Sequence, residues 1–480
     1  MRRPQPYSGS LATTSPRCSL LIMAPLPFLF ACVPLVLASL TVMDPSDYAD
    51  LAADASDNAL DVDYTTDNGG PSYLLYNITG PYYYADEDAE IAYQTLSVNE
   101  NDTSVLVATD GAVVNVSYTE VIKQGYSTWL NQASFFGVNA AINVANASTA
   151  YIDHSNITVH NGAANVYSYG TGSTVYVSDT DLYSSGPVSH GLYASGNGTI
   201  YGSNLRHYSG GERCSSFSGD NPAGYIHVTD AVAHTAGIGS AIFYTLGESY
   251  GTDVVGRADN APSLFSDGAQ TSVFENVDFT AGLLAGTVMF SSSTRSSGAS
   301  LTFSNSRLTT LGDDMPALWF GNVIASATLH ATEINTPSGI LVIANASQIT
   351  QSFDHFVGWE ENSSIQPAQV TVSVTESSLS GDIVAYNGSS IAWNLAKYSS
   401  WTGAASSGRG TAYLGVALDA TSTWTLTKNV YLQNFTNADT KNSNIQSQGY
   451  NIYYNASSSG NAWLKATNTS LPGGGRLQSY

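Results

Sequence analysis

The chain has 480 residues, of which 38 are acidic and 15 are lysine or arginine, so its formal net charge is −23 at pH 7. A nucleic-acid-binding protein needs a basic surface to displace counterions, and this charge therefore excludes nucleic acid as a partner. Only 11% of the residues are charged, but 43% are hydrophobic, and that hydrophobic fraction excludes an intrinsically disordered chain.

Residues 1–38 are predicted to be a signal peptide. Three arginines within the first 17 residues precede an apolar run over residues 20–40, and residues 36–38 (Val-Leu-Ala) supply a small-residue cleavage site. A retained membrane anchor is the alternative because about 20 apolar residues can span a bilayer, but three prolines within the run disfavour it. We therefore expect a secreted protein, extracellular or associated with the cell wall, with no stable membrane span after the leader is cleaved.

Glycosylation sequons and cysteines agree with export. Two of the three cysteines lie in the leader, so Cys214 has no partner for an internal disulfide and a large core must stabilise the fold. Each glycosylated asparagine must face water. The twelve predicted glycosylation sites are Asn77, Asn101, Asn115, Asn146, Asn156, Asn197, Asn345, Asn362, Asn387, Asn434, Asn455 and Asn468.

Residues 39–105 are predicted to form an acidic N-terminal segment. Eight aspartates lie between residues 44 and 67, and no lysine or arginine occurs between residues 18 and 122. Like charges at this density repel one another. We therefore expect a solvated pro-segment or a first cap of the fold that follows.

Residues 106–436 contain a repeated strand-turn-strand pattern. Tyr151, Tyr176 and Tyr201 are spaced by 25 residues, and His227 follows 26 residues later in the same context. A period in the twenties indicates stacked units, and strands of about five residues with Gly or Asn turns indicate β-structure. The sequence therefore predicts an all-β, right-handed parallel β-helix of about a dozen coils, capped by residues 437–480. An antiparallel sandwich or barrel is the alternative.

Stacking in register would turn the repeat into columns of equivalent side chains about 4.8 Å apart. Outward rings at Tyr151, Tyr176, Tyr201 and His227 would form a ladder that either stabilises the sheet or offers a sugar-binding platform. Outward charges alternate in sign in the predicted ion pairs Asp181–Arg206 and Asp278–Arg307–Glu333. The predicted inward column is Ile152, Val177, Val228, Phe274, Phe303, Leu329, Val372 and Leu426, and the later outward positions are Val273, Thr302, Thr328, Thr371 and Thr425.

The period loosens over residues 206–267, where catalytic residues are most expected. Glycoside hydrolysis needs two carboxyl groups about 5–10 Å apart, and lyase chemistry needs a base beside a uronate. The candidates are His190, Glu212, Arg213, Asp220, Glu248 and Asp267. No motif for a nucleophilic serine, a metal or a nucleotide phosphate is found, so no metal and no cofactor are expected.

Over about residues 106–480 the chain resembles the pectin-lyase-like β-helix superfamily. In its Gly-, Ser- and Asn-rich sequence it is most similar to the adhesin-type secreted members. The resemblance rests on residues 190–198 (His-Gly-Leu-Tyr-Ala-Ser-Gly-Asn-Gly) and 422–427 (Ser-Thr-Trp-Thr-Leu-Thr). The Asp-Asp and Arg-x-Lys motifs of polygalacturonases are not found, nor is the calcium-binding aspartate cluster of pectate lyases, so the resemblance selects no enzyme family.

The function expected from the sequence is non-catalytic. We expect an adhesin-like extracellular or cell-surface protein that contacts a polysaccharide or cell-wall glycan through its long faces. One alternative is a polysaccharide lyase or glycoside hydrolase acting from residues 190–267. Another is a purely structural protein, and whether the chain is an enzyme stays open.

Overall fold

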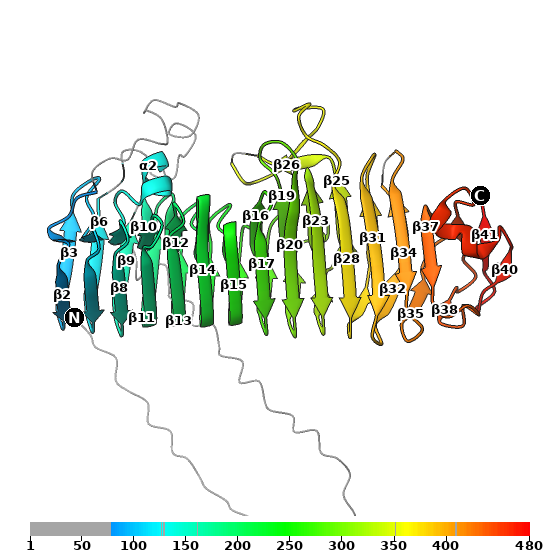
Figure 1. Ribbon diagram of the computed structural model, residues 1–480, viewed down its shortest axis with the longest axis horizontal. Helices are drawn as coiled ribbons and strands as arrows, with labels where there is room; N and C mark the ends of the chain where they lie inside the picture. The colour runs from blue at the N-terminus through cyan, green and yellow to red at the C-terminus, as the bar shows by residue number, and fades with distance from the viewer. Residues whose placement is uncertain (1–77, 126, 128–129, 161, 351, 409) are drawn as a thin grey trace, which may run out of the picture. The chain divides into compact units, whose positions relative to one another are not determined.

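The structure is a computed structural model that describes residues 78–480, except residues 126, 128–129, 161, 351 and 409. It is 57% strand and 3% helix, and its parallel strands stack into a β-solenoid of about 16 turns (Figure 1). The predicted parallel β-helix class is confirmed, with more turns than the dozen expected. The predicted signal peptide, the aspartate-rich residues 44–67 and the sequon at Asn77 lie outside the described residues. No described helix is both long and apolar enough to cross a membrane.

Three columns of parallel strands run along the solenoid, and each coil adds one strand to each column. Several coils bend without a break in the hydrogen-bonded ladder, so the long strands β11, β13, β14 and β15 belong to more than one column. The first column consists of β1 (Tyr82–Ala85), β4 (Leu106–Thr109), β7 (Ile142–Ala145), β10 (Ala163–Tyr169), β12 (Ser189–Ser195), β14 (Phe217–Thr235), β15 (Phe243–Ala258), β16 (Leu264–Asp267), β19 (Thr287–Phe290), β22 (Leu318–Gly321), β25 (Ile340–Asn345), β30 (Asp382–Ala385) and β33 (Ala405–Ser407).

The second column carries the repeated template found in the sequence. Its strands alternate buried and exposed residues, as a sheet with one face on the core requires. Besides β14 and β15 it consists of β2 (Asp88–Ala92), β5 (Val113–Ser117), β8 (Thr149–Asp153), β11 (Thr174–Ser185), β13 (Thr199–Ser209), β17 (Thr271–Glu275), β20 (Ser296–Ser304), β23 (Val323–His330), β28 (Gln369–Thr375), β31 (Ser390–Ala396), β34 (Tyr413–Leu418) and β37 (Asn434–Asn437).

The third column and the C-terminal end complete the solenoid. Besides the long strands, the third column contains β3 (Thr95–Asn99), β6 (Glu120–Gln124), β9 (Asn156–His160), β18 (Asp278–Ala281), β21 (Arg307–Thr310) and β24 (Glu333–Asn335), and a separate sheet contains β29 (Ser378–Ser380), β32 (Ser400–Gly403), β35 (Thr423–Leu426) and β38 (Ile445–Gln446). The last sheet contains β36 (Val430–Leu432), β39 (Ile452–Tyr454), β41 (Arg476–Ser479) and the antiparallel β40 (Thr469–Ser470), next to the 3-10 helix η2 (Ser459–Leu464).

The stacking extends beyond both ends of the predicted repeat. Strands β1, β2 and β3 pair in parallel with β4, β5 and β6, so a complete coil precedes the expected boundary at residue 106. At the other end β39 stacks on β36 and β41 on β39, so coils continue past residue 437. The antiparallel pair β40–β41 then ends the sheet.

Two segments depart from the stacking. The short helix α2 (Leu130–Phe136) interrupts the connection between β6 and β7. Residues 346–367 form an insertion that contains the antiparallel hairpin β26 (Ser347–Ile349) and β27 (Phe356–Gly358). Figure 1 shows α2 and β26 on the same side of the stacked strands.

All eight residues of the predicted inward column are buried. Phe274 packs between Phe243 and Phe303, with ring centroids 4.9 and 5.4 Å away, so the core is a continuous stack of side chains. The corner between the second and third columns is built from residues in the left-handed conformation, among them Asp179, Asn204 and Asp230. Asn and Asp tolerate this conformation better than other side chains, which explains their recurrence after each template strand.

The predicted register is wrong at Thr371 and Thr425. It is also wrong at the inward residues that follow them, because Leu329 pairs with Val374 instead of Val372, and Leu426 pairs with Gly403 in a separate sheet. Thr328 pairs with Ser373, whereas Thr371 pairs with Ser326, and Thr425 belongs to the separate sheet that contains β35. An alternating strand presents the same pattern after a shift of two residues, so alternation alone could not select between Thr371 and Ser373.

Candidate functional site

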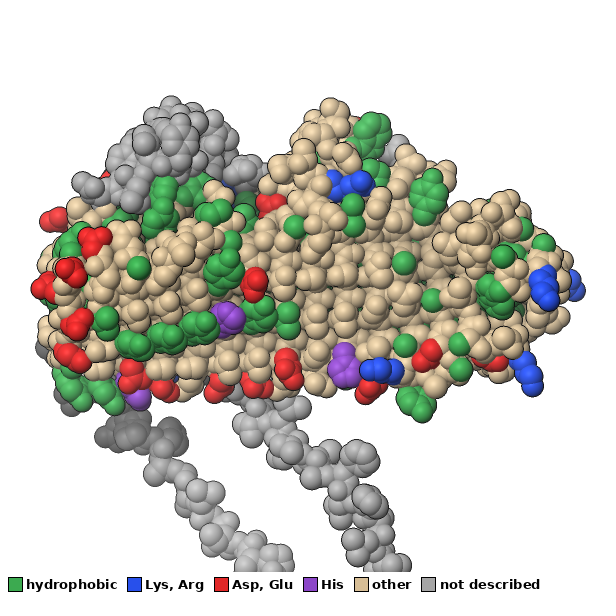
Figure 2. Space-filling view, viewed as in Figure 1, with side chains coloured by type: hydrophobic (Ala, Val, Ile, Leu, Met, Phe, Trp, Pro, Cys, Tyr) green, Lys and Arg blue, Asp and Glu red, His purple; other side chains and the backbone are tan. Residues whose placement is uncertain are grey.

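Five aromatic side chains on the second column form a stack that we call the ring ladder: Tyr151, Tyr176, Tyr201, His227 and Tyr250. The predicted pairings of the first four are confirmed by the strand register. Successive ring centroids lie 5.1, 5.2, 4.8 and 4.6 Å apart. Figure 2 shows such a stripe of green side chains with one purple histidine in it. The repeat did not indicate Tyr250, because this residue follows His227 by 23 residues instead of 25 or 26.

The rings of the ladder lie face to face. The interplanar angle is 7° between Tyr151 and Tyr176 and 11° between Tyr176 and Tyr201. Each inner ring therefore has both faces covered by its neighbours and exposes only its edge to solvent, which in Tyr176 and Tyr201 carries the hydroxyl group. A sugar stacks on the face of an aromatic ring, so this geometry favours sheet stabilisation over a sugar platform.

The predicted charge pairs are present between neighbouring coils. Arg206 lies 2.5 Å from Asp181, and Arg307 lies 3.4 Å from Asp278 and 3.2 Å from Glu333. These side chains are partly exposed, so each pair contributes about 1 kcal/mol at most. Because the acids of these pairs are already neutralised by arginines, they are poor candidates for catalysis.

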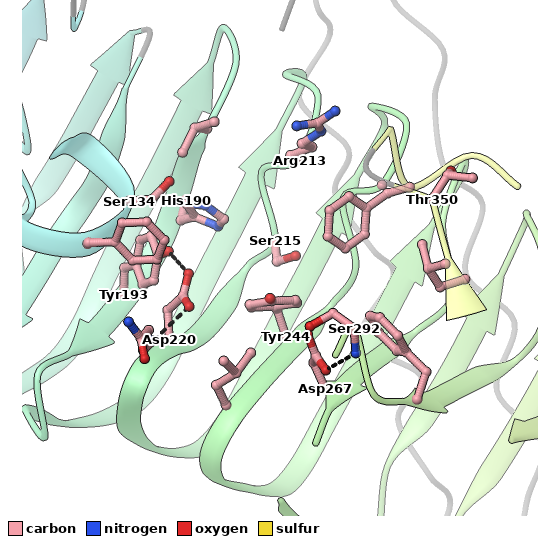
Figure 3. Close-up of a pocket in the computed structure, with 18 residues that line it drawn as sticks. Ser134, His190, Tyr193, Arg213, Ser215, Asp220, Tyr244, Asp267, Ser292 and Thr350 are labelled. Atoms are coloured by element: carbon pink, nitrogen blue, oxygen red, sulfur yellow. Dashed lines mark hydrogen bonds between the residues drawn. The ribbon is translucent and has the colours of Figure 1, made fainter. Parts of the chain in front are cut away.

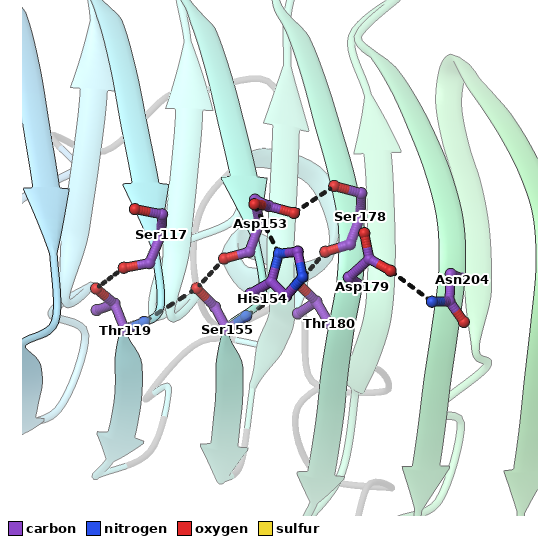
Figure 4. A network of polar contacts seen from close by, with 9 residues as sticks. All are labelled: Ser117, Thr119, Asp153, His154, Ser155, Ser178, Asp179, Thr180 and Asn204. Carbon is purple, nitrogen blue, oxygen red and sulfur yellow. Dashed lines mark hydrogen bonds and ion pairs between the residues drawn. The ribbon is translucent and has the colours of Figure 1, made fainter.

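One group of described residues could hold a metal ion. Ligand atoms of Asp153, His154 and Asp179 all lie within 4.8 Å of one another at an exposed corner. In the structure His154 Nδ1 lies 2.7 Å from Asp153 Oδ2, and Ser178 and Asn204 donate hydrogen bonds to Asp153 and Asp179 (Figure 4). The hydrogen bonds from Ser178 and Asn204 join neighbouring coils, and we assign the network a structural role at this corner.

A cavity of about 320 Å³ lies against the first column of strands, on the side of the solenoid where α2 and the β26–β27 hairpin are located. Strands β12, β14, β15, β16 and β19 provide its floor, while α2 and the 346–367 insertion reach over it (Figure 3). It is lined by Ser134, Phe135, Val188, His190, Tyr193, Arg213, Ser215, Asp220, Asn221, Gly239, Tyr244, Leu246, Asp267, Phe290, Ser292, Ile349, Thr350 and Phe353.

The cavity brings together four of the six catalytic candidates predicted from the sequence. They are His190, Arg213, Asp220 and Asp267. The other two candidates are not among its lining residues. Glu248 accepts a hydrogen bond from Tyr250 at 2.7 Å and thus lies beside the ring ladder, and the backbone carbonyl of Glu212 accepts one from Val188.

The two acids lie on strands that are two coils apart. Gly219 pairs with Thr245, and Thr245 pairs with Ser266, so the residues directly before Asp220 and Asp267 lie about 10 Å apart. The pairing of β14 with β15 becomes irregular directly after Gly219.

Asp220 is held in a buried acceptor site. Tyr193 Oη donates to Asp220 Oδ2 at 2.5 Å, and the Asn221 backbone N–H donates to Oδ1 at 2.7 Å. Burial, together with the nearby charge of Asp267, raises the pKa of Asp220 to about 6 in spite of these hydrogen bonds. Burial also raises the pKa of Asp267, whose Oδ1 accepts a hydrogen bond from the Ser292 backbone N–H at 2.8 Å.

The two basic candidates occupy different environments. Burial lowers the pKa of His190 to about 3, so the ring is neutral, and its Nδ1 lies 3.0 Å from Ser218 Oγ. The Arg213 guanidinium lies 5.6 Å from the centre of the Phe353 ring, at the roof of the cavity. Phe353 reaches this position from the insertion, more than 100 residues away in sequence, and no pattern in the sequence indicates it.

The raised pKa of Asp220 predicts a pH-dependent gain in stability for Asp220→Asn. Between the ordinary value of 3.8 and about 6, the folded chain keeps a proton that the unfolded chain has lost, so stability falls as pH rises through this range. The variant should therefore unfold with a free energy roughly 1–3 kcal/mol higher than the parent at pH 7.5, and with little difference at pH 4. Urea unfolding at both pH values measures this.

The control is Asp230→Asn, which removes the same charge at an exposed corner. It should shift the unfolding free energy equally at both pH values. A loss of stability in Asp220→Asn at pH 7.5 would contradict the burial of an ionised carboxyl group at this position.

Comparison with known proteins assigns no family to this geometry. No family model matches the chain, and no curated protein matches it in sequence. The stacked coils and the cavity are therefore the basis on which a function is inferred.

Proposed function

We propose that this chain is a secreted, glycosylated extracellular protein that binds a glycan in the cavity between α2 and the hairpin. The observation that carries the proposal is the composition of that cavity. Carboxylates of Asp220 and Asp267 can each accept hydrogen bonds from sugar hydroxyls, and Tyr244 and Phe353 supply aromatic surface for the apolar side of a sugar ring. A concave site that combines apolar walls with a few polar groups is typical of ligand recognition.

The cavity is a better candidate than the ring ladder for physical reasons. Inner ladder rings have their faces against one another, whereas Tyr244 is half-buried beside an open volume of about 320 Å³. Within the described part of the chain, Asp220 and Asp267 form no ion pair with an arginine, in contrast to Asp181 and Asp278. Binding of a glycan to the exposed ring edges of the ladder is the second possibility.

Export and glycosylation belong to the same proposal. Eleven of the predicted sequon asparagines lie in the described part of the chain, and none of these eleven is buried. This partial exposure is compatible with the requirement that a glycosylated asparagine face water. The resemblance to pectin-lyase-like and adhesin-type β-helices supports contact with extracellular polysaccharide.

Cavity and ladder variants separate the two binding surfaces. Tyr244→Ala should weaken retention on the polysaccharide that the parent binds by about tenfold, because truncation of an aromatic side chain at the centre of a binding site typically costs more than about 1 kcal/mol of binding free energy. The combined variant Tyr151→Ala, Tyr176→Ala and Tyr201→Ala should be retained like the parent. Affinity electrophoresis in gels that contain neutral, acidic or amino polysaccharides measures this, with thermal unfolding to verify folding. The opposite result would move the site to the ladder.

Glycoside hydrolysis is a second candidate function, favoured by the spacing of the two acids. Carboxyl groups on adjacent coils would lie about 5 Å apart, as retaining enzymes require, whereas acids two coils apart approach the 6.5–9.5 Å of inverting enzymes. Asp220, with its raised pKa, would be the general acid. Asp267 would activate the water that attacks from the opposite face of the sugar.

This candidate predicts products of inverted anomeric configuration. Release of reducing ends from a panel of polysaccharides should be abolished by Asp220→Asn and by Asp267→Asn, and should persist in Asp230→Asn. Proton NMR of the first products reports their configuration. Retained configuration, or full activity in either cavity variant, would exclude the acid pair as the catalytic pair.

A further inference from the structure

The described residues that line the cavity carry an excess of negative charge. Asp220 and Asp267 are both lining residues, and Arg213 is the one lysine or arginine among the described residues that line it. His190 adds no charge because burial keeps its ring neutral. With both carboxyl groups ionised, the net charge of the described lining residues is −1.

The positive charge of Arg213 is set apart from the two acids. Its guanidinium lies over the Phe353 ring at the roof, while the two carboxyl groups belong to the floor. Figure 3 shows Arg213 away from both acids and Tyr244 between them. Among the described residues, the charge that acts on Asp220 comes from Asp267, another acid.

We infer that the glycan bound in this cavity is an amino sugar whose protonated amine lies between Asp220 and Asp267. The inference rests on the proposed function and names the class of its ligand. An ammonium group is a compact cation with three donors, and it can donate to carboxylates on either side of it. A cation beside the Tyr244 ring face gains further attraction.

Other sugars fit the same place less well. An N-acetylated sugar brings a neutral amide, which leaves the two carboxylates without a compensating charge. A uronate adds a third negative charge to a site of low exposure, where repulsion is poorly screened. The floor should therefore select against acidic polysaccharides such as those that a uronate lyase would need.

Calorimetry at pH 7 with matched oligosaccharides tests the inference on the full-length protein. The ligands are the tetramer of β-1,4-linked glucosamine, its fully N-acetylated counterpart and a tetramer of galacturonate. We expect the free-amine tetramer to bind at least tenfold more tightly than the acetylated one, and the galacturonate tetramer to bind weakest. In Asp267→Asn the free-amine tetramer should lose its tenfold advantage over the acetylated tetramer.

Two controls keep the outcomes distinct. Asp230→Asn changes the net charge of the protein by the same amount at an exposed corner, and it should leave all three affinities unchanged. Thermal unfolding verifies that Asp267→Asn is folded. Equal or tighter binding of the acetylated or acidic tetramer would overturn the inference and leave glycan binding in place. If none of the three tetramers binds, and no polysaccharide retains the protein, the proposed function is overturned as well.

Discussion

In-register stacking of parallel coils is the constraint on which the rest of the structure depends. Strand β11 pairs with β8 on one side and β13 on the other, so Tyr176 lies between Tyr151 and Tyr201. Because neighbouring strands are about 4.8 Å apart, any side chain repeated at this period becomes part of a column. Repeated apolar residues produce the core, repeated rings produce the ladder, and alternating charges produce ion pairs.

The cavity arises where this regularity is broken. The pairing of β14 with β15 shifts register between Gly219 and Gly224, directly beside Asp220. The helix α2 and the insertion of residues 346–367 then cover the floor from above. Burying acids in this way costs free energy, as their raised pKa values show, and the long regular stacks on both sides can tolerate that cost. Acids kept at such a cost are typical of functional sites.

The features that the sequence predicted correctly are those that depend on the local period. Inward burial at Ile152 and Val177, the Tyr ladder and the pair Asp181–Arg206 each follow from residues one coil apart. The errors have equally physical causes. The predicted register of Thr371 is wrong because a shift of two residues leaves the alternation unchanged. That of Thr425 is wrong because a new sheet begins after the insertion.

The candidate site was predictable only in part. Loss of period over residues 206–267 indicated the region, and the four candidates His190, Arg213, Asp220 and Asp267 indeed meet there. The position of Glu248 in the sequence predicts a place in the site, but this residue lies beside the ladder, where it accepts a hydrogen bond from Tyr250. The roof residue Phe353 depends on a contact across several coils, which no single-sequence pattern encodes.

Cross-linking between coils tests the stacking most directly. Cysteines placed at Tyr176 and Tyr201 replace side chains that pair directly, at a Cα separation within the 4.4–6.8 Å that a disulfide requires. Cysteines at Tyr176 and Ser203 are offset by two residues along the strand, which puts their Cα atoms about 8 Å apart. Stacking in register predicts rapid oxidation of the first pair and none of the second, measured by mass spectrometry of peptides after mild oxidation. Equal cross-linking of both pairs, or of the second alone, would contradict it.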